Sequence, residues 1–341
     1  MTKKSVGKLP SVESIKDTYT LSSVWKEVVS KGIEDFQKIL RWEDSRKVLV
    51  IWPCSADFEE SLEEYAQFLV WLNEKYWDKI LFLMRFYTGK PRTVGWWKGL
   101  SYSTPGEEPD LIKWLENTRR IAIKLIEKYR IPLAEEMLHP EMSDYFDDIY
   151  SYQVVGARSL ENQYHREVMS GINCPAGLKN HTLWDLQFMV NAIAAATLPS
   201  SYVTALWEVY ETTGNSYAHW IHRGAERGET NYNLGSILES YNLMEEKNIE
   251  NKAIIIDCNH DNSKKNPEKQ IQIMSEVMQN TSSQPEVYDF VKWFMIESYI
   301  YDGRQDVKDF STVKKGLSMT DPCIGLEATE MLVRELYSLV K

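Results

Sequence analysis

Residues 48–54 read VLVIWPC, an apolar run of strand length that ends in a cysteine. Continuous apolar runs of about four to eight residues are typical of strands buried on both faces, as in parallel sheets. Seven more such runs follow along the chain, each with a polar side chain near its C-terminal end. They are ILFLMRFY (80–87), PLAEEML (132–138), YQVVGAR (152–158), CPAGLK (174–179), HWIHRG (219–224), AIIIDCNH (253–260) and FMIES (294–298).

Stretches with helical periodicity lie between most of these runs. Eight strand–helix units predict an α/β fold, the (β/α)8 TIM barrel, which we expect to span residues 46–341 as the catalytic part of the chain. Residues 1–45 are expected to form an N-terminal extension with one helix at 24–40 and an irregular lead-in around Pro10. The barrel helices are expected at 58–77, 109–129, 160–171, 184–197, 233–248, 264–280 and 325–340.

Two connections differ from simple helices. Residues 88–108 are rich in Gly, Pro and basic residues, and a loop of this length in a compact domain is usually functional. Residues 200–213, SSYVTALWEVYETT, are rich in strand-forming residues and predict a short accessory hairpin.

The composition excludes several classes of partner. The chain has 341 residues and a net charge of -11, which argues against general binding to nucleic acid or to an anionic membrane. No apolar run is long enough to cross a membrane, and the basic N-terminus lacks the apolar segment of a secretory signal. The four cysteines show no paired spacing, so we expect a reduced, cytoplasmic setting.

Cationic side chains recur at strand ends, which meet at one face of a TIM barrel. Lys and Arg are rarely buried without an anionic partner, so a ring of them predicts a small substrate with phosphate and carboxylate groups. The alternative is that each one pairs with a structural Asp or Glu, or reaches solvent. The candidates are Arg85, Lys90, Arg92, Arg158, Lys179 and Arg223.

A second set of side chains has the chemistry of metal ligands. Cys54, His260, Glu297 and Asp321 could together bind one divalent ion such as Mn, Fe, Co or Zn. Taken singly, Cys54 could be a buried packing thiol and His260 a hydrogen-bonded core histidine. Asp257 could orient the His260 imidazole or cap a turn.

Several motifs occur in the order found in a known family. They are WPCS (52–55), MRFYTGKPRTVGWWKGL (84–100), VVGARSLENQYHRE (154–167), CPAGLKN (174–180), DCNHDNS (257–263), MIES (295–298) and SMTDPCIGLE (318–327). With these motifs, nearly the whole chain resembles the class I 3-deoxy-7-phosphoheptulonate (DAHP) synthases. That family uses a (β/α)8 barrel to condense phosphoenolpyruvate with erythrose 4-phosphate in the first step of the shikimate pathway.

The resemblance implies roles for individual residues. The metal ligands would be Cys54, His260, Glu297 and Asp321, and the catalytic residues Lys90, Cys54 and His260. A phosphorylated aldose would meet Arg92 and Thr93 of KPRT. We also expect a homodimer or homotetramer. The phosphoenolpyruvate site would use Arg85, Lys90, Arg158, Lys179 and Arg223.

The sequence also departs from the family pattern. Trp52 stands where the family usually has Gly, HTLW (181–184) replaces GTDG, and Asn259 replaces Ser. We expect Trp52 to narrow the aldehyde side of the pocket. The hairpin at 200–213 is shorter than that of feedback-inhibited members, and Asn173 replaces a Ser of their inhibitor pocket. These differences leave open a diverged paralogue that condenses phosphoenolpyruvate with another aldehyde. A catalytically inactive regulatory subunit is a third reading, against which the complete ligand set argues.

Overall fold

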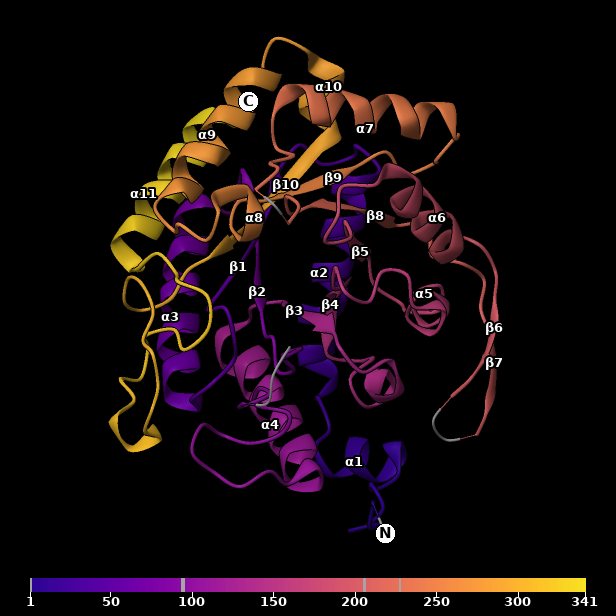
Figure 1. Ribbon diagram of the computed structural model, residues 1–341, viewed down its shortest axis with the longest axis vertical. Helices are drawn as coiled ribbons and strands as arrows, with labels where there is room; N and C mark the ends of the chain where they lie inside the picture. The colour runs from indigo at the N-terminus through magenta and orange to yellow at the C-terminus, as the bar shows by residue number, and fades with distance from the viewer. Residues whose placement is uncertain (1, 93–95, 205–206, 227) are drawn as a thin grey trace.

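The computed structural model describes residues 2–92, 96–204, 207–226 and 228–341. Eight parallel strands close into a barrel in the order β1-β10-β9-β8-β5-β4-β3-β2 (Figure 1). This confirms the predicted TIM barrel. The strands are β1 (Lys47–Trp52), β2 (Ile80–Arg85), β3 (Leu133–Met137), β4 (Tyr150–Val155), β5 (Ala176–Lys179), β8 (Ala218–His222), β9 (Ile254–Asp257) and β10 (Val291–Glu297).

Helices connect most of the strands and surround the barrel (Figure 1). Several of them begin at a side chain that accepts hydrogen bonds from the first free backbone N–H groups, as Asp110 does for Ile112 and Lys113. The helices are α1 (Val12–Thr18), α2 (Ser23–Leu40), α3 (Glu59–Tyr76), α4 (Leu111–Tyr129), α5 (Gln163–Met169), α6 (Leu186–Thr197), α7 (Leu234–Glu246), α8 (His260–Ser263), α9 (Lys269–Thr281), α10 (Pro285–Phe290) and α11 (Leu326–Leu339), with 3-10 helices η1 (Pro140–Tyr145) and η2 (Phe310–Thr312).

The barrel strands are buried on both faces, which explains their uninterrupted apolar sequences. All residues of β1 and β10 are buried. Alternate residues point into the barrel or out toward the helices. Val48, Val50 and Trp52 of β1 therefore belong to the cluster inside the barrel, and Leu49 and Ile51 to the cluster under the helices.

Helix α2 closes the N-terminal end of the barrel. Phe36 is fully buried, and its ring lies 4.9 Å from that of Tyr152 and 4.7 Å from that of Trp293. The ring of His219 lies 5.9 Å away, and its Nε2 is 2.9 Å from the hydroxyl of Tyr152. This aromatic layer fills one end of the barrel and leaves the opposite end for a site.

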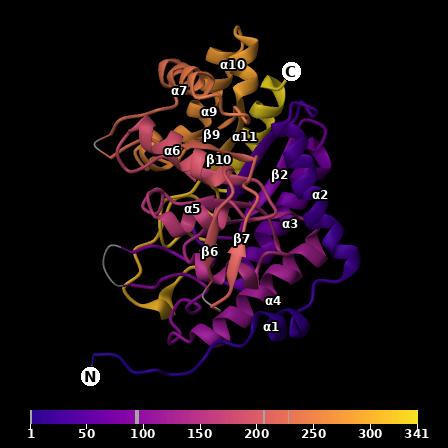
Figure 2. The same ribbon diagram turned by 90° about the vertical axis from the view of Figure 1, so that its right-hand side faces the viewer.

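The lead-in around Pro10 is irregular, as predicted, but residues 12–18 form a helix, α1, that the sequence did not indicate. The Ser11 hydroxyl accepts a hydrogen bond from the backbone N–H of Ser14, and Ile15 packs against Leu115 of α4 and Tyr145 of η1. Figure 2 shows α1 beside α4. The helix is shorter than two turns, so its sequence carries little periodic signal. The helix predicted at 264–280 also begins later, at Lys269, because Pro267 precedes it.

The predicted accessory hairpin is present. β6 (Ser201–Val203) pairs antiparallel with β7 (Val209–Glu211) and runs beside α5 on the outside of the barrel (Figure 1). Among the described residues, no helix is both long enough and apolar enough to cross a membrane.

Candidate active site

A cavity of about 570 Å³ opens at the C-terminal end of the barrel. Its lining comes from the last residues of β2, β3 and β5 and from the segments that follow all eight barrel strands. Active sites of TIM barrels lie at this end. The cationic side chains among the described lining residues are Arg85, Lys90, Arg92, Arg158, Lys179, Arg223, Lys265 and Arg304.

The alternation of strand residues explains how the polar side chains reach this cavity. Leu81 and Leu83 of β2 point into the barrel, and Arg85 is the next inward position. Along β10, Trp293 and Met295 likewise precede Glu297. In both β2 and β10 the inward series is apolar at depth and ends in a charged residue, Arg85 or Glu297.

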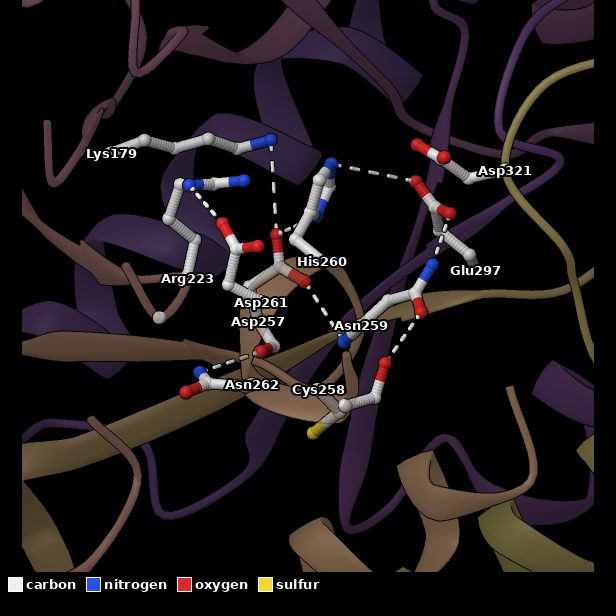
Figure 3. A network of polar contacts seen from close by, with 12 residues as sticks. Lys179, Arg223, Asp257, Cys258, Asn259, His260, Asp261, Asn262, Glu297 and Asp321 are labelled. Atoms are coloured by element: carbon white, nitrogen blue, oxygen red, sulfur yellow. Dashed lines mark hydrogen bonds and ion pairs between the residues drawn. The ribbon is translucent and has the colours of Figure 1, made fainter. Parts of the chain in front are cut away.

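Three of the four predicted metal ligands form one compact group. One ligand atom from each of Cys54, Glu297 and Asp321 lies within 4.8 Å of the others, and the Cys54 Sγ is 3.8 Å from Oδ2 of Asp321. The fourth, His260, places its Nε2 3.8 Å from Oε1 of Glu297 (Figure 3). The structure therefore brings all four side chains together.

The surroundings of this group favour a bound cation. Oε1 of Glu297 is buried and has no hydrogen-bond partner among the described residues. Burial, followed by the charge of Glu297, raises the pKa of the Cys54 thiol to about 11. A thiolate ligand at this position would require a positive charge beside it. Thiolate, imidazole and carboxylate together fit a divalent ion of borderline softness.

Side chains of the β9 segment fix the orientation of the ligands. His260 Nδ1 is 2.7 Å from Oδ2 of Asp257, which leaves Nε2 facing Glu297 (Figure 3). Burial opposes ionisation of Asp257, but the charges of His260 and Lys179 lower its pKa to about 2. The Asn259 amide donates a hydrogen bond to Oε2 of Glu297. Asp257 thus holds the imidazole, as one of the two readings of the sequence expected.

Arg85 lies between two aromatic rings, and two of its three nitrogens have no hydrogen-bond partner among the described residues. Its guanidinium is 3.4 Å from the centre of the Trp52 ring and 3.0 Å from that of Tyr87. Nη2 approaches the carbonyl oxygen of Cys54 at 3.4 Å. Nε and Nη1 are buried and have no hydrogen-bond partner within the described chain. Oε1 of Glu297 lies 3.8 Å from Nη2, so one end of the guanidinium has a carboxylate at ion-pair distance. The free Nε and Nη1 indicate a site for a further anion that the protein does not supply.

Two other cations are paired with carboxylates. Lys179 Nζ is 2.8 Å from Oε2 of Glu136, and Arg223 Nη1 is 2.7 Å from Oδ2 of Asp261. Burial acts to raise the pKa of Glu136, but the charges of Lys179 and Arg85 hold it well below its usual range. Glu136 is therefore an anion that keeps this wall of the cavity from being purely cationic.

The remaining predicted cations line the cavity at its edge. Lys90 Nζ is 3.4 Å from the Cys54 Sγ, which places an ammonium beside the ligand group. Arg92 donates from Nε to the Trp97 carbonyl oxygen at 3.0 Å, and burial lowers its pKa. Arg158 is exposed and forms no ion pair with another described residue. Thr93 lies outside the described residues.

The expected effect of Trp52 on the pocket is wrong. Trp52 is fully buried inside the barrel and is not among the described residues that line the cavity. As the last inward residue of β1, it lies against the guanidinium of Arg85. Arg85 thus lies against the Trp52 ring and lines the cavity, whereas the indole itself belongs to the packed interior of the barrel.

Sequence reasoning left out Lys265. Its Nζ is 3.0 Å from Oδ1 of Asp321, and that carboxylate raises the pKa of Lys265. In turn, although burial opposes it, the charges of His260 and Lys265 lower the pKa of Asp321. Lys264 and Lys265 both have positive φ, 55° and 58°, so the chain turns sharply here. Nothing in the local sequence pattern indicates that turn.

Comparisons with known proteins agree with this geometry. Residues 26–334 match the model of the DAHP synthetase I family. The chain is 32% identical to the Trp-sensitive phospho-2-dehydro-3-deoxyheptonate aldolase of Escherichia coli K12, over 89% of this chain and 87% of the relative. It is 32% identical to the phenylalanine-inhibited aldolase of the same name from Saccharomyces cerevisiae, over 99% and 93%. A solved phospho-2-dehydro-3-deoxyheptonate aldolase from Francisella tularensis superposes with a TM-score of 0.93 at 29% identity, covering 100% of this chain and 98% of that one.

Proposed function

This chain belongs to the DAHP synthetase I family, and on that premise we propose that it is a transferase that condenses phosphoenolpyruvate with erythrose 4-phosphate. The products would be 3-deoxy-D-arabino-heptulosonate 7-phosphate and inorganic phosphate. The observation that carries the proposal is the buried Arg85 with two free donors, next to a group of potential metal ligands at one cavity. An anionic substrate and a divalent ion would meet there.

Different cations of the cavity would bind the carboxylate and the phosphate of phosphoenolpyruvate. Arg85 and Lys90 would hold its carboxylate, and the free Nε and Nη1 of Arg85 match the two oxygens of that group. Arg158, Lys179 and Arg223 would hold its phosphate. Trp52 and Tyr87 fix the plane of the Arg85 guanidinium, so the enol is held in one orientation.

The donor set fits one divalent ion, held by Cys54, His260, Glu297 and Asp321. When bound, such an ion supplies a Lewis acid for the acceptor carbonyl. Lys90 Nζ lies 3.4 Å from the Cys54 Sγ, beside the proposed metal ligands and where an aldehyde oxygen would gain negative charge. We assign delivery of that proton to Lys90 or to a water molecule.

The bond changes follow from the two substrates. Carbon 3 of the enol forms a bond to the aldehyde carbon, water adds at carbon 2, and the bond from carbon 2 to the phosphate oxygen breaks. The phosphate leaves from the subsite of Arg158, Lys179 and Arg223. Arg92, which lines the same cavity, would hold the phosphate of the acceptor together with Thr93, as the family resemblance implies.

A coupled assay tests the proposed function. Purified protein with added Mn²⁺ should consume phosphoenolpyruvate only when erythrose 4-phosphate is present, and should release one phosphate per molecule consumed. Consumption of phosphoenolpyruvate with an unphosphorylated aldehyde, and no consumption with erythrose 4-phosphate, would contradict the acceptor assignment.

The second candidate function is a synthase of the same type that uses another aldehyde as the acceptor. Thr182, from the HTLW segment that departs from the family pattern, lines the cavity and motivates it. A panel of aldehydes separates the two.

Arg158 offers a clean test of the phosphate subsite. Because it pairs with no carboxylate in the described chain, Arg158→Ala removes a cation without leaving an unpaired anion behind. A charge-assisted hydrogen bond contributes about 1.5–3 kcal/mol, so binding of phosphoenolpyruvate should weaken at least about tenfold. The KM for phosphoenolpyruvate measures this. Arg334→Ala, on the exposed face of α11, is the control and should leave the KM unchanged. An unchanged KM in Arg158→Ala would show that the subsite is assigned wrongly.

The short hairpin leads to a prediction about regulation. The strands β6 and β7 have three residues each, and their outward side chains Val203 and Val209 are exposed at 52% and 70%. We expect Phe, Tyr and Trp each to inhibit weakly at millimolar concentration, because the short hairpin and Asn173 do not rebuild the inhibitor pocket. Initial rates with each amino acid check this. Strong inhibition by any of them at micromolar concentration would overturn it.

A further inference from the structure

The ion pair between Arg223 and Asp261 lies behind the cavity wall. Arg223 lines the cavity, whereas Asp261 is not among the described residues that do. Nη1 of Arg223 and Oδ2 of Asp261 are 2.7 Å apart and neither atom is exposed to solvent, but their geometry is not that of a hydrogen bond, so the contact is an ion pair (Figure 3). One side of the guanidinium is therefore bound by the protein, and only the rest can meet a ligand.

The backbones that carry the pair are held together tightly. The N–H of Arg223 donates to Oδ1 of Asn180 at 2.8 Å, and the N–H of Asp261 donates to the Arg223 carbonyl oxygen at 3.1 Å. Gly224 has φ 77°, and a Cβ there would lie 2.5 Å from the backbone nitrogen of Asn262. Only glycine allows this close approach. With both backbones fixed, the carboxylate and guanidinium have little freedom to separate when a ligand binds.

The phosphate subsite must release its ligand as well as bind it. The proposed reaction leaves inorganic phosphate among Arg158, Lys179 and Arg223. Three such cations close to one dianion would hold it strongly. Lys179 has Glu136 at 2.8 Å, but Glu136 itself lines the cavity. Asp261 supplies a negative charge to the same subsite without occupying any of the substrate space.

We propose that Asp261 is a positioning residue that acts through Arg223 and sets how tightly the subsite holds phosphate. It turns the remaining guanidinium donors toward the cavity, and its fixed charge weakens the hold on phosphate so that the product leaves. The inference rests on the proposed function and adds the control of product release to it. The ligand concerned is a phosphate dianion, either free or as the phosphoryl group of phosphoenolpyruvate.

Asp261→Asn tests the proposal, because the amide keeps an oxygen for Arg223 and removes the charge. Calorimetric binding of inorganic phosphate to the Mn²⁺-loaded enzyme should become tighter by on the order of tenfold, since a unit charge close to the ligand is lost. The inhibition constant of phosphate against phosphoenolpyruvate should fall in parallel. Metal content, measured on the same samples, should equal that of the wild type.

Asp306→Asn is the matched control. It removes the same charge from the rim of the cavity, where Asp306 is 83% exposed and pairs with Arg304 at 3.3 Å. Water screens that charge, so phosphate affinity should change less than about twofold. Asp261→Ser removes the charge with a smaller side chain and gives the same measurement if the Asn variant does not fold.

Each result decides one question. Tighter phosphate binding in Asp261→Asn, with Asp306→Asn unchanged, supports the proposal. Unchanged or weaker binding in an active Asp261→Asn enzyme overturns it and leaves the proposed function standing. If the wild type binds no phosphate and consumes no phosphoenolpyruvate, the proposed function itself fails.

Discussion

Cys54→Ala should reduce the rate of condensation at least about a thousandfold, because the loss of a bound Lewis acid removes several kcal/mol of stabilisation from the transition state. The Sγ of Cys54 is one of three ligand atoms within 4.8 Å of one another, and Lys90 Nζ also contacts it. The side chain is small, so the folded state should lose only about 1 kcal/mol. Metal analysis of the purified variant should show less than one bound ion per chain.

Cys174→Ala is the control for this variant. Cys174 is also a buried thiol, and burial raises its pKa to about 12, but it precedes β5 at the other end of the barrel from the cavity. Its loss should cost similar stability and leave the rate intact. Exhaustive chelation of the wild type should reproduce the defect of Cys54→Ala, and Mn²⁺ should restore the wild type only. Full activity in chelated, metal-free protein would exclude the metal site.

Trp52→Gly should lower the free energy of unfolding by about 3–5 kcal/mol, the cost of removing a large aromatic side chain from a packed core. Trp52 is fully buried, with Arg85 against one face of its ring. A glycine within β1 adds further to the loss. This loss is a large part of the total free energy of unfolding of a typical domain, roughly 5–15 kcal/mol. Equilibrium denaturation in urea measures the change.

The companion variants separate packing from function. Trp52→Phe keeps a ring beneath the guanidinium, so we expect it to retain most of the affinity for phosphoenolpyruvate at a smaller loss of stability. Trp77→Gly, at an indole that is 60% exposed beyond α3, should change the unfolding free energy by less than about 1 kcal/mol. A Trp52→Gly protein as stable as the wild type would contradict the packing described for this residue.

The sequence was sufficient to predict the barrel and most of its strand ends. A buried strand whose only polar residue is at its last inward position can be recognised in a single sequence. LFLMR of β2 is an example. The same two-residue alternation places Glu136 in the cavity lining and Asp257 beside His260, although neither is among the predicted binding residues. Counting inward positions from the core would have selected both.

Other features depend on turns and close contacts that the sequence does not reveal. Trp52 is close to Cys54 along the chain but packs inside the barrel and does not line the cavity, because burial is set by the strand and not by distance in sequence. Lys265 reaches Asp321 through two successive residues with positive φ, a conformation that lysine seldom adopts. The Asp261 pair requires β8 and α8 to approach at Gly224. These distances are set by tertiary packing, and residue type alone does not predict them.

The pairing of β1 with β10 has a consequence for how this chain folds. Val48 lies beside Trp293, so the barrel cannot close until nearly the whole polypeptide has left the ribosome. Cys54 follows the first strand, Glu297 ends the last one, and Asp321 lies beyond it, so the ligand group lies across the seam where the barrel closes. A divalent ion bound there would join the first and last strands. It should slow unfolding much more than it speeds folding, because the seam forms late.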